Sequence, residues 1–313
     1  MTLFVCWLVF PLLLGAICLG CGLAVERCSR APIHPPLVVP VGFAAVVVVG
    51  LFTTLSAQTA RLTLPSVLAL AALDLASSVP RALPRIDPWA AGSAVVVFAV
   101  FASPVVLSGE ATFAGYIKLD DTATFLALAD RALEHGRSLD GLAPSSYEAA
   151  LDVNLHFYPL GSLLSLGMGS ALTGQDAAWL FQPLLAFLAS LLALVLYQLA
   201  SLVTTSRPWR ATAAVLGAQA ALLYGYALWG GVKELAAAPL VALVAALAGT
   251  LLTSARRGLA VVSLAVAAAA LVGVLSIGAA AWLLPMLGLA AWALVHRVGA
   301  AGHFSWPASP PRW

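Results

Sequence analysis

The sequence predicts an all-α polytopic membrane protein. Hydrophobic residues make up 62% of its 313 residues, charged residues only 9%, and the mean hydropathy is +1.01. A water-soluble domain of this length does not carry so apolar a composition. The apolar residues form runs of helical period, and these runs are far too long to be strands of a membrane barrel.

Nine apolar runs are long enough to cross a bilayer, whose hydrocarbon core of about 30 Å needs roughly 20 residues per helix. They lie at residues 2–25, 37–57, 62–79, 89–107, 177–203, 211–230, 235–253, 259–276 and 279–296. We therefore expect about nine transmembrane helices, four in an N-terminal region (1–107) and five in a C-terminal region (177–300). Between them, 108–176 is predicted to be an external loop with amphipathic and interfacial helices, and 301–313 is a polar tail.

The predicted topology depends on the segment 157–174, FYPLGSLLSLGMGSALTG, which is apolar but short and rich in Gly and Ser. If this segment spans the bilayer, the later arginine-bearing loops fall outside the cell. If it lies along the interface or re-enters, those arginines fall inside, as the positive-inside rule favours. We therefore expect a plasma-membrane protein with its N-terminus outside and its C-terminus in the cytoplasm. The long loop and the turn before 235–253 then share the external face, whereas ten spans would separate them.

The external loop holds 9 of the 13 acidic residues of the chain. Asp120 and Asp121 precede a predicted amphipathic helix that runs to about Glu134, and Gly136 is placed to end it. The helix is predicted to have an apolar face (Phe125, Leu128, Ala129, Ala132, Leu133) and a water-facing side (Asp130, Arg131, Glu134, Arg137). The acid at its start is interpreted either as a helix cap or as a general base or metal ligand at the membrane surface.

The segment DTATFLALADRAL resembles the first external loop of membrane glycosyltransferases of the C fold class. Asp121, Phe125 and Ala129 match the Asp, the aromatic residue and the Ala of that family's loop helix. HFYPLGSLLSLGMGSALTG followed by QDAAWLFQPLLAFLASLLALVLYQLA is similar to its Pro-aromatic interfacial helix and the long span that follows. The resemblance covers about residues 107–252. The chain stops at HFSWPASPPRW, which suggests a truncated member.

The resemblance implies inverting transfer of a sugar from a polyprenyl-phosphate donor to an external acceptor, with Asp121, or secondly Asp120, as the general base. Glu234 resembles the place of another acid in some members, so Asp121 and Glu234 are candidate ligands of a divalent metal. Lys233 or Arg131 is expected either to pair with the donor phosphate or to anchor the interface. His156 and Tyr158 are the further candidate substrate-binding residues, His156 either as a metal ligand or as an interfacial hydrogen-bonding group.

A non-enzymatic protein, either a transporter-like bundle or an accessory subunit of envelope assembly, is the alternative interpretation. Transporters place broken helices and polar groups near mid-membrane, whereas the polar residues here gather outside the predicted spans. No basic patch suggests nucleic acid as a partner. The expected partners are the bilayer and the lipid-linked sugar, and the sequence identifies no protein partner.

Overall fold

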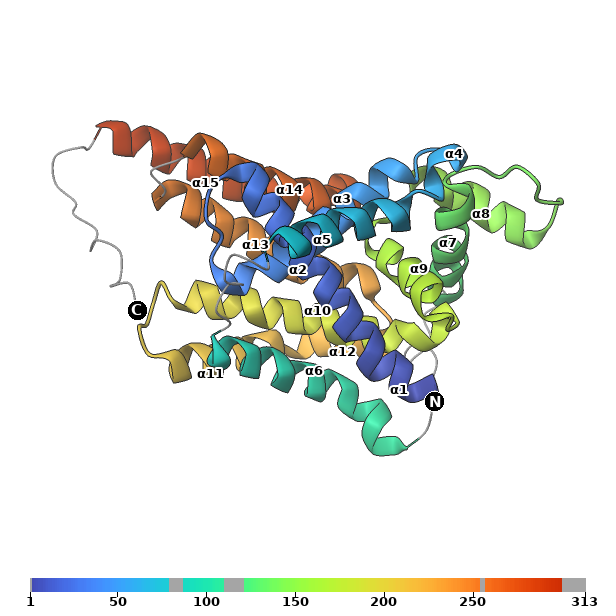
Figure 1. Cartoon of the computed structure of the whole chain (residues 1–313), viewed down its shortest axis with the longest axis horizontal. Helices are drawn as coiled ribbons and strands as arrows, with labels where there is room; N and C mark the ends of the chain where they lie inside the picture. The colour runs from blue at the N-terminus through green and yellow to red at the C-terminus, as the bar shows by residue number, and fades with distance from the viewer. Residues whose placement is uncertain (1, 79–86, 110–120, 254–256, 300–313) are drawn as a thin grey trace.

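The computed structural model describes residues 2–78, 87–109, 121–253 and 257–299, and every regular element in these ranges is a helix (Figure 1). The chain is an all-α, multi-pass membrane protein, as its composition predicts. The elements are α1 (Thr2–Phe4), η1 (Val5–Val9), α2 (Phe10–Ser29), α3 (Pro35–Thr53), α4 (Ala57–Ala60), α5 (Thr63–Ser78), α6 (Pro88–Ser108), α7 (Asp121–His135), α8 (Ser146–Phe157), α9 (Gly161–Thr173), α10 (Ala177–Ala200), α11 (Arg207–Ala218), α12 (Ala221–Trp229), α13 (Val232–Thr253), α14 (Arg257–Leu275), η2 (Ser276–Ala279) and α15 (Ala280–Gly299).

Helices α2, α3 and α5 pack closely through small residues. A Cβ added at Gly20 of α2 would lie 2.6 Å from the carbonyl oxygen of Ala71 in α5. Gly42 of α3 likewise leaves no room for a side chain against Cys18 of α2. Membrane helices use small residues in this way to bring their backbones together.

Helix α10 lies at the centre of the bundle. It contacts α2, α3, α6, α7, α9, α11 and α13, and every side chain from 180 to 193 is buried. A helix that is apolar on all sides is stable only when its whole circumference is covered. The core of the protein is therefore built around α10.

All nine predicted spans are helical, but they differ in length and continuity. Length and composition identify six candidate spans among the described residues, or seven if the α11–α12 pair counts as one. Helix α5 has 16 residues and is shorter than a full span. The last two predicted spans belong to one helical run, Ala260–His296, of 37 residues. Ser276 within it has left-handed backbone (φ 52°), and α14 and α15 on either side of this break both pack against α13.

The predicted span 211–230 is wrong in its continuity. It is divided between α11 and α12, which are bent by 50° relative to each other. Gln219 stands at the break, and its amide Nε2 donates to the Val215 carbonyl at 3.0 Å. Only α12, with nine residues, is apolar throughout, and it is too short to cross the bilayer alone.

Helix α9 corresponds to the segment that decides the topology. Its 13 residues extend over about 20 Å, which is less than the hydrocarbon thickness of about 30 Å. The segment was predicted either to lie along the interface or to re-enter the membrane; burial of Gly161–Gly169 by protein throughout favours the second of these arrangements. Glycines allow this: a Cβ at Gly167 would lie 2.6 Å from the Ala129 carbonyl oxygen of α7, and one at Gly161 would lie 2.6 Å from that of Gly273 in α14.

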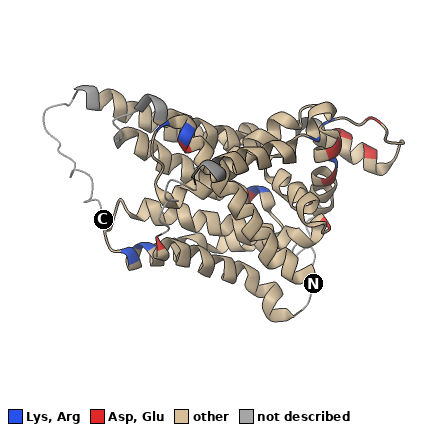
Figure 2. Cartoon of the chain, in the orientation of Figure 1, with Lys and Arg blue, Asp and Glu red and all other residues tan. Residues whose placement is uncertain are grey.

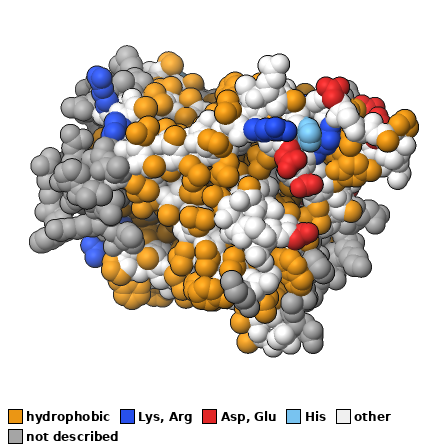
Figure 3. Space-filling model, turned by 45° about the vertical axis from the view of Figure 1, so that its right-hand side comes forward, with side chains coloured by type: hydrophobic (Ala, Val, Ile, Leu, Met, Phe, Trp, Pro, Cys, Tyr) orange, Lys and Arg blue, Asp and Glu red, His pale blue; other side chains and the backbone are white. Residues whose placement is uncertain are grey.

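Many of the charged residues gather toward the two ends of the long axis, and most of the helical length between them carries no charge (Figure 2). Acidic residues of α7 and α8 lie at one end, and the arginines at the start of α11 lie at the other. The space-filling view shows hydrophobic side chains over most of the visible face between these ends (Figure 3). This is the distribution expected of a surface in contact with lipid.

Candidate functional site

Helix α7 brings the predicted base to one end of the bundle. It begins at Asp121 and ends before Gly136 (φ 58°), whose N–H donates to the Ala132 carbonyl at 3.1 Å. The predicted terminator is thereby confirmed. The predicted apolar face is buried, with Phe125 at 5% exposure, except for Leu133, which is half-buried; the Asp121 side chain is exposed at the first turn. A carboxylate in this position is stabilised by the helix dipole by about 0.3–1 kcal/mol.

Tyr158 connects α7 to the link between α8 and α9. Its N–H ends α8 by donating to the Asn154 carbonyl at 2.8 Å. Its ring lies 5.5 Å from that of Phe125, with an angle of 41° between the two planes. Pro159 follows, and α9 begins two residues later. An aromatic pair of this kind contributes about 0.5–1.5 kcal/mol beyond its burial.

The turn between α12 and α13 lies beside the start of α7, although the two segments are far apart in the sequence. Gly230 has φ +86°, a conformation that glycine adopts at little cost. The N–H of Gly231 donates to the Tyr226 carbonyl at 2.8 Å and closes the turn. A Cβ at Gly230 would lie 3.1 Å from Oγ1 of Thr122. The turn therefore lies directly against the first turn of α7.

Lys233 and Glu234 follow this turn in the first turn of α13. The Lys233 Nζ lies 3.9 Å from the Glu234 Oε1, and both side chains are about one-third exposed (31% and 32%). The same Nζ lies 5.3 Å from the centre of the Tyr158 ring, within the range of a cation–π interaction. Lys233 is therefore held between a carboxylate and an aromatic face.

Two carboxylates act on the Tyr158 hydroxyl. Burial raises the pKa of Tyr158, and the charges of Glu234 and then Asp121 raise it further. The hydroxyl therefore stays protonated near neutral pH and lies close to both acids. We call Asp121, Phe125, Tyr158, Lys233 and Glu234 the Tyr158 cluster. The ten-span alternative would place Asp121 and Glu234 on opposite faces, which does not agree with their presence in one cluster.

Of the three other predicted site residues discussed next, the structure describes the side chain of Arg131 alone. Arg131 is only 7% exposed; its Nε and Nη2 donate to the carbonyls of Ser138 and Asp140, each at 2.9 Å. The expectation that Arg131 faces water is wrong, because its guanidinium fixes the loop after α7. His156 lies in α8, but its side chain is outside the described part of the structure, and Asp120 lies wholly outside the described residues.

Arg137 is a basic residue that the sequence did not single out as a binding group. It lies just after α7, is partly buried, and donates through Nη1 to the Leu155 carbonyl. With Tyr158 it lines a hollow of about 420 Å³ beside the cluster. The helical pattern placed Arg137 toward water, and no local signal indicated the folded-back segments that surround it.

A divalent metal could draw two protein ligands from the cluster. Mg²⁺ sites often use one or two carboxylates together with substrate phosphates and waters, and Asp121 with Glu234 supplies that number. Within the described ranges, no group of three or more His, Cys, Asp or Glu side chains is assembled for a metal. The residues therefore fit a metal bound together with substrate, but not a closed site made by protein alone.

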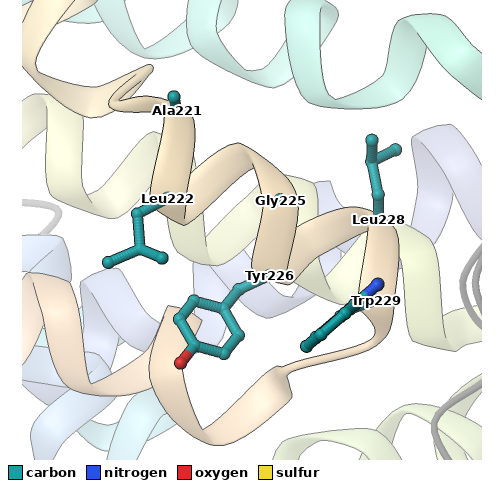
Figure 4. Close-up of a pocket in the computed structure, with 6 residues that line it drawn as sticks. All are labelled: Ala221, Leu222, Gly225, Tyr226, Leu228 and Trp229. Carbon is teal, nitrogen blue, oxygen red and sulfur yellow. The ribbon is translucent and has the colours of Figure 1, made fainter.

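A second hollow runs along α12 next to the turn. It measures about 290 Å³ and is lined by Ala221, Leu222, Gly225, Tyr226, Leu228 and Trp229. The rings of Tyr226 and Trp229 lie on the same side of α12 as Leu222 (Figure 4). Its walls are almost entirely apolar, and it therefore offers no chemistry of its own.

No protein-family model, curated protein or solved structure matches this chain.

Proposed function

We propose that this protein is a membrane glycosyltransferase that moves a sugar from a polyprenyl-phosphate donor to a cell-envelope acceptor. The observation that carries the proposal is that the first turns of α7 and α13, with Asp121 and Glu234, meet beside Tyr158, as the contacts of Phe125 and Lys233 with the Tyr158 ring and of Gly230 with Thr122 show. Charged residues that come together from distant parts of a membrane protein are by default candidates for a functional site. Packing alone does not require two carboxylates beside one tyrosine.

In the proposed reaction Asp121 accepts the proton of an acceptor hydroxyl while that oxygen attacks the anomeric carbon of the sugar. The bond between the anomeric carbon and the donor phosphate breaks, and the phosphate leaves with the bonding electrons. The attack comes from the opposite side, so the configuration inverts. Glu234 holds Lys233 near the site, and Tyr158 offers a neutral hydroxyl that can donate to a sugar or phosphate oxygen.

The proposed location is the plasma membrane, with the cluster on the external face, the N-terminus outside and the C-terminus in the cytoplasm. In support, α1 begins toward the end of the molecule that carries α7, and α15 ends toward the opposite end (Figure 1). Arg207 and Arg210 lie at that opposite end, as expected for a cytoplasmic side.

The test is sugar transfer from polyprenyl-phosphate donors in proteoliposomes. Asp121→Asn should lower the transfer rate by about 10²–10⁴-fold, because a positioned base contributes that much. Asp130→Asn is the matched control, since Asp130 is an exposed acid of the same helix, and it should transfer at the wild-type rate. Full activity in Asp121→Asn would refute the assignment. A folded wild-type protein that is inert with all donors would favour the non-enzymatic interpretation.

A further inference from the structure

The hollow beside Tyr158 is formed by four parts of the chain: the end of α3, the link after α7, the link between α8 and α9, and the end of α14. Its lining includes Arg137 and Tyr158 together with Leu51, Leu55, Pro159 and Val272. The volume of about 420 Å³ is in the lower part of the range for small-molecule sites. Tyr158 is its shared wall with the Tyr158 cluster.

Arg137 gives this hollow a positive charge. Among the residues that the structure describes, it forms no ion pair, and its one hydrogen bond goes to the Leu155 carbonyl. Burial lowers the pKa of Arg137, although an arginine remains charged in proteins. A guanidinium has five N–H donors, so most of them stay available for an anion. Partial removal from water strengthens its attraction for that anion.

The other cations near the Tyr158 cluster are already engaged. Arg131 donates to two backbone carbonyls, and Lys233 lies between Glu234 and the Tyr158 ring. Arg137 is therefore the basic side chain best placed to receive a phosphate. Its separation from the carboxylates by Tyr158 avoids direct repulsion between a bound phosphate and the acids.

The walls of the hollow point to a lipid rather than a free ion. Leu55 is 60% exposed and Val272 is 47% exposed, so apolar side chains continue from the hollow to the outer surface. A hydrocarbon chain leaving the hollow would cover them, and each buried CH₂ contributes about 0.8 kcal/mol. Inorganic phosphate would gain nothing from these contacts.

We propose that this hollow binds the phosphate group of a membrane lipid, with Arg137 pairing with the phosphate and the lipid chain leaving past Leu55 and Val272. Its use as the anchor of the sugar donor rests on the proposed function, whereas its binding of a lipid phosphate does not.

The test uses the purified full-length chain in an uncharged detergent and radiolabelled farnesyl phosphate as the probe. Farnesol, which lacks the charge, and inorganic phosphate, which lacks the chain, should each bind at least about tenfold more weakly. Arg137→Gln should weaken farnesyl phosphate binding by about ten- to a hundredfold, as expected for loss of charged hydrogen bonds. Arg210→Gln is the matched control, because Arg210 also donates to a backbone carbonyl, that of Thr204 at 2.8 Å, and it should bind like wild type.

Val272→Trp keeps Arg137 but narrows the hollow, and it should also weaken the binding of farnesyl phosphate. This variant tests the proposal if Arg137→Gln does not fold. Wild-type affinity in either folded variant, or equal loss in Arg210→Gln, would overturn the proposal. So would inorganic phosphate that binds as tightly as farnesyl phosphate, because the site would then be an ion site only. Binding through Arg137 without sugar transfer would refute the proposed function alone, whereas transfer without such binding would refute this inference alone.

Discussion

Gly167 sets the distance between α9 and α7, and its replacement by alanine should loosen the support of the Tyr158 cluster. The added Cβ would lie 2.6 Å from the Ala129 carbonyl oxygen and 2.9 Å from the Leu133 Cδ1. Since backbone cannot rotate away as a flexible side chain can, α7 has to withdraw by roughly 0.8–1.4 Å to reach the ordinary contact distance of 3.4–4 Å.

The size of the effect follows from two opposing terms. Overpacking in a closely packed core costs about 1–3 kcal/mol, whereas Gly→Ala inside a helix gains about 0.5–1 kcal/mol. The net loss of stability in Gly167→Ala is then up to about 2.5 kcal/mol, and the apparent Tm should fall by up to about 5–10 °C. Gly92→Ala in α6 is the matched control, because a Cβ there meets nothing within 4 Å, and its Tm should stay equal or rise.

A thiol-reactive dye can follow unfolding in detergent, because Cys6, Cys18 and Cys21 are buried and become reactive only when the bundle opens. Cys28 is exposed and reacts before heating. Scans at one fixed rate are needed, since an irreversible transition depends on scan rate. Equal apparent Tm values for Gly167→Ala and Gly92→Ala would refute the close approach of α9 to α7.

Three further outcomes are expected. Arg131→Gln should lower the free energy of unfolding by about 1.5–3 kcal/mol and speed amide hydrogen exchange in the loop after α7, because that loop loses its hydrogen bonds to the guanidinium. Unchanged exchange would contradict the role of Arg131 in fixing this loop. Gly230→Ala should slow sugar transfer, because a φ of +86° strains any residue other than glycine by about 1–2 kcal/mol. Gly225→Ala is the control, because a Cβ there meets nothing within 4 Å. Equal transfer rates in the two variants would contradict a role of the α12–α13 turn in the site. Cysteines at Ser145 and Thr205, both exposed, should be labelled from the outside and from the cytoplasm respectively; labelling from one side would refute the topology.

Local patterns were sufficient to predict the helices. The end of α7 followed from Gly136 and its buried face from the apolar spacing, and both agree with the structure. The cap predicted from Asp120 or Asp121 stays a prediction, because residue 120 lies outside the described residues. The break between α11 and α12 was missed because the run of apolar residues continues across it. Burial of α9 was also missed, since its close contacts depend on glycines facing partners in distant helices.

The sequence predicted several residues of the candidate site, but it did not predict how they are arranged in space. The acids stood out because charge is rare in this chain, and shared topology suggested that Asp121 and Glu234 lie on one face. That Tyr158 lies between them depends on how α9 folds into the bundle, which no local pattern encodes. The same holds for Arg131 and Arg137, whose surroundings come from the loop after α7 and the link from α8.

The central claim is that the first turn of α7 meets the turn between α12 and α13 beside Tyr158. A Cβ at Gly230 lies 3.1 Å from the Thr122 Oγ1, so cysteines at these two positions fall near the Cβ separation of about 3.5–4.5 Å that a disulfide needs. In a background without other cysteines, Thr122→Cys with Gly230→Cys should form an intramolecular disulfide on mild oxidation. The pair Thr122→Cys with Gly225→Cys should not form it. No disulfide in the first pair, although the protein is folded and both thiols react with a small reagent, would contradict the site on which the proposed function depends.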